Sequence, residues 1–310
     1  MIEDRAALDQ WYVVANFADL DAATTVRTML LGEAIEVARQ ADGAAILHNG
    51  CELPVDIRYG LVWTTLGQPG RDIFALPEAA EPDRRAVYCG SVTVRASGLR
   101  LIENFLDLAH FPYVHNDILG EEEHPEVAKY EVDHRRDVDE LWATKCEFFQ
   151  PRAAVSSEGG QISRYMYRVV SPFNVMLYKT PPSAPNRWDV IALFVQPVEP
   201  TLSIAHPCLL VIDNTSTDAE LAAFQQMIFL QDKIVLENQR PLLLPLQPLL
   251  PPGTRPQVVD GRAESRRVRG VRLPHELERV GGHPRHGDLH RHRRREHAPC
   301  RAAQAGNGSP

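Results

Sequence analysis

The chain has 310 residues and a formal net charge of −8, with 44% hydrophobic and 24% charged residues. This balance is typical of a globular protein and argues against a disordered or collagen-like chain. No apolar run approaches the roughly 18 residues that span a bilayer, and the acidic start at Met1–Arg5 lacks the pattern of a secretory signal. We therefore expect a cytoplasmic protein that binds no membrane.

Charge is distributed unevenly along the chain. Residues 261–310 contain twelve Arg, no Lys and five acidic residues and so carry +7, whereas the preceding 260 residues carry −15. The acidic body argues against binding to nucleic acid. Its cysteines form no CxxC or Cys-x-His pair, which argues against a disulfide framework and against a self-contained zinc site.

Short β-rich runs occupy the first part of the chain, at 11–14, 25–30, 34–38 and 61–67. Turn residues such as Gly32 separate these runs, which is typical of strands in a small sandwich or barrel. We expect residues 1–80 to form this small β domain, followed by a second domain over residues 81–245.

The second part of the chain combines helical and strand patterns. Residues 99–115 have the apolar period of a buried helix, and Thr217 with Glu220 forms a capping box that begins another helix. Between these helices, runs rich in β-branched and aromatic residues are separated by Pro and Gly clusters, which predicts an antiparallel sheet. These runs lie at 162–169, 174–178 and 190–195. The expected fold class is α+β.

Both predicted helices place polar side chains in apolar surroundings. The first has Asp107 and His110, with His115 beyond Pro112, and the second has Asp232 within its apolar stripe. Two neutral imidazoles and a carboxylate are the ligand set of non-haem Fe(II). The alternative is that the two histidines are hydrogen-bonded core residues and that Asp232 forms an ion pair with an Arg. The four residues together favour a metal site.

The sequence of residues 103–115, ENFLDLAHFPYVH, resembles the N-x-x-D-x-x-H-x-x-x-x-H motif of Rieske non-haem iron oxygenase α subunits. Within that family it is most similar to the vanillate O-demethylase-like and phenoxybenzoate dioxygenase-like branch. Residues 231–241 resemble the second signature, which supplies the third iron ligand. The resemblance covers roughly residues 10–245 and implies a catalytic domain of the helix-grip type, with an antiparallel sheet around a long helix.

This resemblance implies a role for each matching residue. His110, His115 and Asp232 would bind a mononuclear Fe(II), Asp107 would orient a ligand histidine and relay electrons, and Asn104 would lie near the metal. Dioxygen would be the co-substrate, a ferredoxin or reductase the electron donor, and a homotrimer the assembly. The implied reaction is hydroxylation or oxidative O-demethylation of an aromatic or alicyclic small molecule. Apolar residues of the sheet are candidates for the substrate pocket: Met166, Phe173, Met176 and Phe194.

The chain departs from the family where the Rieske cluster would be bound. A [2Fe–2S] cluster of this type needs two Cys and two His, which the family supplies as C-x-H and C-x-x-H. At the corresponding place the chain reads HNGCELP, residues 48–54, and neither pair occurs in the sequence. The resemblance therefore implies that residues 1–80 are a truncated Rieske-like β domain without the segment that carries the cluster, and that electrons come from elsewhere. An alternative function is a catalytically impaired member that acts as an apolar ligand-binding module.

Residues 246–310 are rich in Pro, Arg and His and poor in large apolar residues. Such a segment cannot bury enough apolar surface to fold, so we expect a disordered tail. An arginine-rich arm, a His-rich metal-binding tract and a shifted reading frame are the alternatives for this composition. The chain contains no P-loop, no G-x-G-x-x-G motif and no G-x-S-x-G elbow, which argues against nucleotide-dependent enzymes and α/β-hydrolases.

Overall fold

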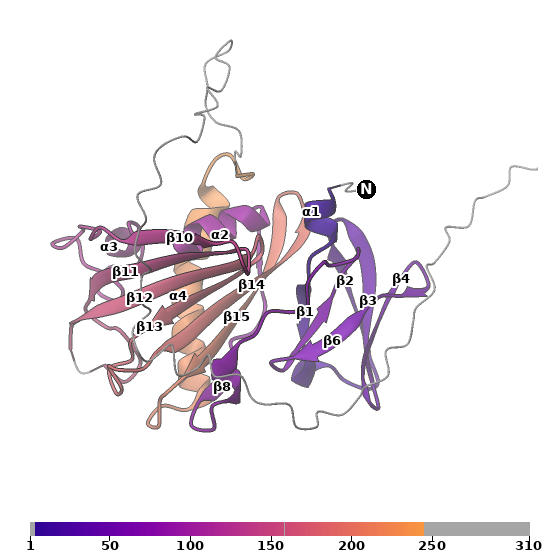
Figure 1. Cartoon of the computed structure of the whole chain (residues 1–310), viewed down its shortest axis with the longest axis horizontal. Helices are drawn as coiled ribbons and strands as arrows, with labels where there is room; N and C mark the ends of the chain where they lie inside the picture. The colour runs from indigo at the N-terminus through magenta and orange to yellow at the C-terminus, as the bar shows by residue number, and fades with distance from the viewer. Residues whose placement is uncertain (1–3, 158, 245–310) are drawn as a thin grey trace, which may run out of the picture. The chain divides into compact units, whose positions relative to one another are not determined.

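The structure is a computed structural model that describes residues 4–157 and 159–244. Two small antiparallel sheets form the N-terminal part (Figure 1). A three-stranded sheet has the order β1-β7-β6, and a four-stranded sheet has the order β2-β3-β4-β5. Their strands are β1 (Tyr12–Asn16), β2 (Thr25–Leu30), β3 (Glu33–Gln40), β4 (Gly43–His48), β5 (Cys51–Glu52), β6 (Val55–Arg58) and β7 (Leu61–Thr64). Short helical turns precede and follow β1, namely α1 (Arg5–Leu8) and η1 (Phe17–Asp19).

A tight turn joins β4 and β5 at the place where the sequence lacks the family's cluster-bearing segment. His48 pairs directly with Cys51 across the hairpin, and Asn49 and Gly50 form its two-residue turn with φ values of 50° and 78°. Positive φ at both positions suits Asn-Gly and matches the right-handed twist of a hairpin. The two strands are thus joined by the shortest common connection.

An eight-stranded antiparallel sheet forms the larger part of the structure, in the order β10-β11-β12-β13-β14-β15-β8, with β9 also pairing with β15. Successive side chains along each strand point alternately toward the helices and toward the N-terminal sheets or solvent. They are β8 (Arg85–Tyr88), β9 (Val92–Val94), β10 (Glu131–Arg135), β11 (Glu140–Gln150), β12 (Gln161–Ser171), β13 (Asn174–Lys179), β14 (Asp189–Glu199) and β15 (Leu202–Val211). The turn η2 (Pro77–Ala80) precedes β8.

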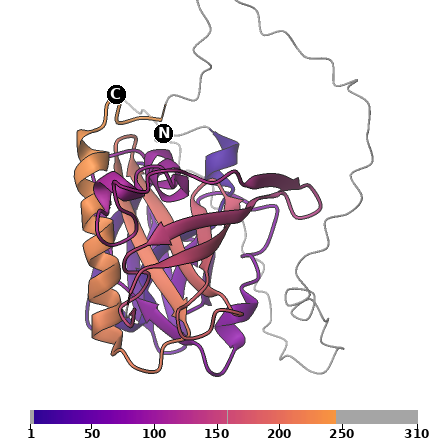
Figure 2. The same ribbon diagram turned by 90° about the vertical axis from the view of Figure 1, so that its left-hand side faces the viewer.

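The long helix α4 (Asp218–Asn238) lies along one face of this sheet (Figure 2). Its N-terminus has the predicted capping box, because the Thr217 and Glu220 side chains each accept the other's backbone N–H. The buried side of α4 contributes Phe229 and Leu236 to a core shared with Leu101. The α+β fold with an antiparallel sheet around a long helix is therefore as predicted.

The helix predicted over 99–115 is interrupted. It divides into α2 (Gly98–Leu106) and the single turn α3 (Phe111–Val114). Asp107 ends α2 in an extended conformation, and its carboxylate accepts the backbone N–H of Ala109 at 2.9 Å. This side-chain-to-backbone bond competes with continued helix. The break changes the direction of the chain before the first histidine.

The N-terminal sheets are hydrogen-bonded to the large sheet. The Leu31 backbone N–H donates to the Pro197 carbonyl at 2.7 Å, and the buried Gln196 amide donates to the Thr28 hydroxyl at 3.0 Å. Asn174 of β13 donates to the Trp11 carbonyl at 3.0 Å. These bonds attach the small sheets along β13 and β14.

The tail predicted over 246–310 lies outside the described residues. Within residues 4–157 and 159–244, no helix is both long enough and apolar enough to cross a membrane.

Candidate metal centre

The turn α3 brings the two histidines of the first motif together. His110 precedes this turn and His115 follows it. Backbone N–H groups of Val114 and His115 close the turn by donating to the carbonyls of His110 and Phe111 at 2.9 and 3.0 Å. Asp232 lies on the buried side of α4, opposite this turn. Two separate parts of the chain therefore supply the three side chains.

Three donor atoms of these side chains converge. The His110 Nε2 and His115 Nε2 atoms are 3.2 Å apart, and Asp232 Oδ1 lies 3.3 Å from His110 Nε2 and 3.0 Å from His115 Nε2. Ligands at right angles around a metal ion at about 2.1 Å lie about 3.0 Å from each other. The three separations therefore fit one face of an octahedral metal site.

Outer hydrogen bonds orient both rings toward this point. His110 Nδ1 donates to Asp107 Oδ2 at 3.3 Å, and His115 Nδ1 donates to Gln231 Oε1 at 2.8 Å. With Nδ1 protonated in each ring, the Nε2 lone pairs face the convergence point, as metal ligation requires. The Asn104 amide also donates to Asp232 Oδ1, at 3.3 Å.

Electrostatics at the centre favour a bound cation. Burial opposes charge on His110, but hydrogen bonds to Asp107 and Asp232 raise its pKa to about 9. Burial likewise raises the pKa of Asp232, yet the two histidines hold it below its usual range. Two carboxylates thus stabilise positive charge at this point, and the ligand types present would suit a divalent ion such as iron.

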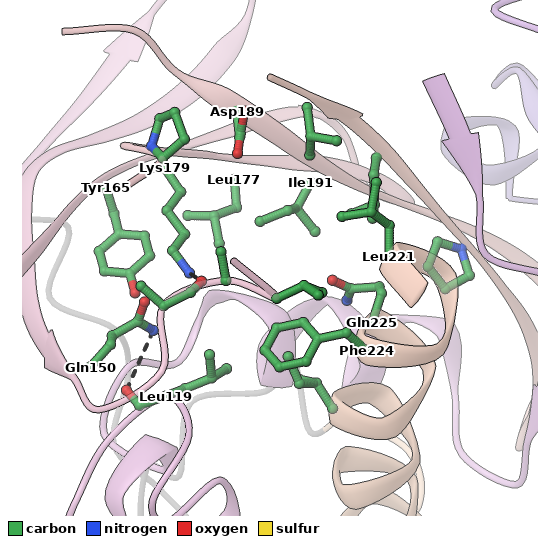
Figure 3. Close-up of a pocket in the computed structure, with 18 of the residues that line it drawn as sticks. Leu119, Gln150, Tyr165, Leu177, Lys179, Asp189, Ile191, Leu221, Phe224 and Gln225 are labelled. Atoms are coloured by element: carbon green, nitrogen blue, oxygen red, sulfur yellow. Dashed lines mark hydrogen bonds between the residues drawn. The ribbon is translucent and has the colours of Figure 1, made fainter. Parts of the chain in front are cut away.

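The three donors open onto a cavity with about 1150 Å³ of empty space, its open mouth included. Its wall is mainly apolar, which is typical of small-molecule sites. The apolar lining includes Phe105, Phe111, Leu119, Leu177, Ile191, Leu209, Leu221, Phe224 and Ile228. Figure 3 shows that strands of the sheet supply one wall and α4 another. The apolar character of this lining suits a small aromatic molecule.

The residues predicted to line the pocket from the sheet do not line this cavity. They are Met166, Phe173, Met176 and Phe194. Met166 and Met176 lie in the strands that do line it, but their neighbours Tyr165, Tyr167 and Leu177 face the cavity. Successive strand residues point to opposite faces, so the prediction chose the face of the sheet that points away from the cavity. Phe173 and Phe194 instead pack on rings of the N-terminal sheets, Tyr12 and Trp63, with ring centroids 5.6 and 5.1 Å apart.

Three polar residues of the site were not predicted. Gln231 adjoins Asp232 in the second signature, so its position beside a ligand could have indicated its role. Gln150 and Lys179 stand at the ends of strands β11 and β13. Polar residues at strand ends are commonly exposed, so nothing in the sequence marks these two as buried.

An antiparallel sheet around a long helix, with two histidines and a carboxylate converging at an apolar cavity, defines the catalytic domain of an oxygenase α subunit. Residues 94–299 match the family of vanillate O-demethylase oxygenase C-terminal domains, and the chain belongs to this family. The predicted resemblance to Rieske-type oxygenase α subunits is thereby confirmed, and the chain is an oxidoreductase of this class without the Rieske cluster ligands.

Individual relatives agree with this assignment. The chain is 44% identical over 248 residues to a probable methylxanthine N7-demethylase, NdmC, of Pseudomonas sp. (strain TJI-51), covering 79% of this chain and 88% of the relative. The fold is similar to that of Pseudomonas putida CBB5 NdmA with caffeine, with a TM-score of 0.64, 18% identity, and 79% and 86% of the two chains covered. Dicamba monooxygenase bound to dicamba gives a TM-score of 0.59 at 18% identity over 75% and 87% of the chains.

Proposed function

We propose that this chain catalyses the oxidative demethylation or hydroxylation of a small aromatic molecule at a mononuclear Fe(II), with dioxygen as co-substrate. The observation that carries the proposal is the convergence of His110, His115 and Asp232 at the wall of an apolar cavity. N-demethylation of a methylated heteroaromatic ring is favoured over O-demethylation, because the 44% identical relative is named as a probable methylxanthine N7-demethylase.

The residues of the chain have separable tasks in this proposal. Fe(II), held by the two histidines and Asp232, would supply the redox chemistry that activates dioxygen. Asp107 and Gln231 fix the ring orientations of His110 and His115 through their Nδ1 atoms. The apolar cavity wall excludes water and positions the substrate near the three donor atoms.

Electrons must enter from outside this chain. The sequence holds neither C-x-H nor C-x-x-H, so we assign their supply to a ferredoxin or reductase partner. Asp107 is the member of the centre closest to solvent, because its side chain is 48% exposed while those of His110 and Asp232 are each 13% exposed. We propose Asp107 as the point of electron entry. A homotrimer also remains a prediction.

Metal analysis combined with oxygen uptake tests the function. The full chain, reconstituted with Fe(II) and given an artificial reductant and 7-methylxanthine, should bind about one iron per chain and release formaldehyde. His110→Ala should lose both iron and uptake. His124→Ala is the matched control, because the His124 side chain is 62% exposed. Equal uptake by wild type and His110→Ala would contradict the proposal.

A ligand-binding module without turnover is the second candidate function. The missing cluster ligands favour it, because this chain has no redox centre of its own to reduce an iron site. In that case the cavity would bind an aromatic ligand without iron, and no reductant would produce formaldehyde.

A further inference from the structure

The cavity has a polar end formed by strands of the sheet. Gln150 ends β11 and Lys179 ends β13, and both residues are buried, with 1% and 7% of their surfaces exposed. Both line the same cavity as the three converging donors. In Figure 3 the Lys179 side chain reaches from the sheet toward the region where Gln150 and Tyr165 lie. The metal centre makes no use of either residue.

Gln150 lines the cavity, and the acceptor atom of its amide has no partner among the described residues. Its Nε2 donates to the Leu119 carbonyl at 3.4 Å, and a carbonyl can only accept, which fixes the amide orientation. The other atom, Oε1, is fully buried and has no hydrogen-bond partner among the described residues. A buried acceptor without a partner is costly. A ligand that donates an N–H would satisfy it.

Lys179 presents donors to the same part of the cavity. Its Nζ donates to the Ala153 carbonyl, and an ammonium group has three N–H donors. It forms no ion pair with a described residue; the carboxylate of Asp189, also in the wall, instead accepts the Ile212 backbone N–H at 2.8 Å. The remaining donors of Lys179 would therefore be satisfied by an acceptor on a ligand.

We propose that Gln150 and Lys179 form a recognition subsite for the cyclic amide edge, –NH–C(=O)–, of a heteroaromatic ligand. The ring N–H donates to Gln150 Oε1, and the adjacent carbonyl oxygen accepts from Lys179 Nζ. The inference rests on the proposed function, which places a methylated heteroaromatic substrate in this cavity.

The subsite predicts selection between two ligands of the same ring system. 7-Methylxanthine keeps N–H groups beside its carbonyls, whereas caffeine has every such nitrogen methylated. A site built to pair a buried acceptor with an N–H rejects an analogue that lacks the N–H. We expect calorimetry on the full chain to give an affinity for 7-methylxanthine at least about tenfold higher than for caffeine.

Substitutions separate the two contacts. Gln150→Leu should lower the affinity for 7-methylxanthine to that for caffeine. Gln150→Glu keeps an acceptor and should retain the preference for 7-methylxanthine over caffeine. Lys179→Met should lower the affinity for both ligands by about tenfold, because both carry the carbonyl. Lys129→Met, at an exposed lysine, should change neither affinity.

The outcomes also separate this inference from the proposed function. Equal wild-type affinities for the two ligands, binding of neither ligand, or a preference that survives Gln150→Leu would each overturn the subsite. Binding with the expected preference but without formaldehyde release would overturn the proposed function and leave the subsite standing. Thermal unfolding of each variant identifies any change in affinity that results from loss of the fold.

Discussion

The hydrogen bond from His115 to Gln231 should control metal affinity. His115 is 1% exposed and its Nδ1 donates to Gln231 Oε1 at 2.8 Å. Gln231→Leu removes this acceptor, so the ring loses the partner that fixes its tautomer and orientation. Loss of such a partner typically reduces metal affinity by about 10- to 100-fold, which corresponds to about 1.4–2.8 kcal/mol.

The assay is a competition titration of Fe(II), or of Co(II) as a redox-stable substitute, against a chromophoric chelator. Gln231→Glu retains an acceptor and should preserve most of the affinity. Gln226→Leu is the matched control, because Gln226 on the same helix donates to the Cys89 carbonyl at 2.7 Å without contacting a proposed ligand. If Gln231→Leu and Gln226→Leu bound metal with equal affinity, the orienting role of Gln231 would be refuted.

Three further predictions concern stability. Glu140→Ala should lower the free energy of unfolding by about 3–5 kcal/mol, because Arg168 donates to both Glu140 oxygens at 2.7 and 2.8 Å in a buried pair. Glu131→Ala removes one partner of an exposed pair and should lower it by less than about 1 kcal/mol. Urea titrations that gave equal losses for the two variants would contradict this reasoning. Thr217→Ala should cost about 1 kcal/mol through loss of the capping box, measured in the same way, and an unchanged midpoint would argue against it. Burial lowers the pKa of Lys179 from 10.5 to about 8, so the unfolded chain binds more protons between these values and the free energy of unfolding should rise by up to about 3 kcal/mol from pH 8 to 10.5. This rise should be absent in Lys179→Met. If the free energy of unfolding of the wild type and of Lys179→Met changed with pH in the same way, Lys179 would not be the source of the rise.

Local signals in the sequence predicted much of the fold and named the three residues that converge at the candidate metal centre. The capping box at Thr217 depends on residues three apart, so it can be predicted without knowledge of tertiary contacts. Asp232 was predicted within an apolar stripe, and the structure places it opposite the two histidines. A buried carboxylate needs a nearby partner, which is why the pattern alone indicated a site.

Features set by tertiary contacts were not predictable in the same way. One local feature was missed as well: the helix predicted over 99–115 ends at Leu106, because the Asp107 carboxylate accepts the backbone N–H of Ala109. An alternating strand shows which residues share a face, but both faces of β13 are buried here. Polarity could therefore not distinguish Met176 from Leu177, and the cavity wall was assigned to the opposite face. Gln150 is recognisable as a buried residue only once the packing around it is known.

The attachment of the small N-terminal sheets has a consequence for the stability of the large sheet. Gln196 is fully buried, and its amide is satisfied by Thr28 and the Met29 carbonyl of β2. Removing the N-terminal strands would leave that amide and the Trp63-facing ring of Phe194 uncovered. These contacts show that the N-terminal strands cover and stabilise the large sheet, although the chain itself holds no Rieske cluster ligands.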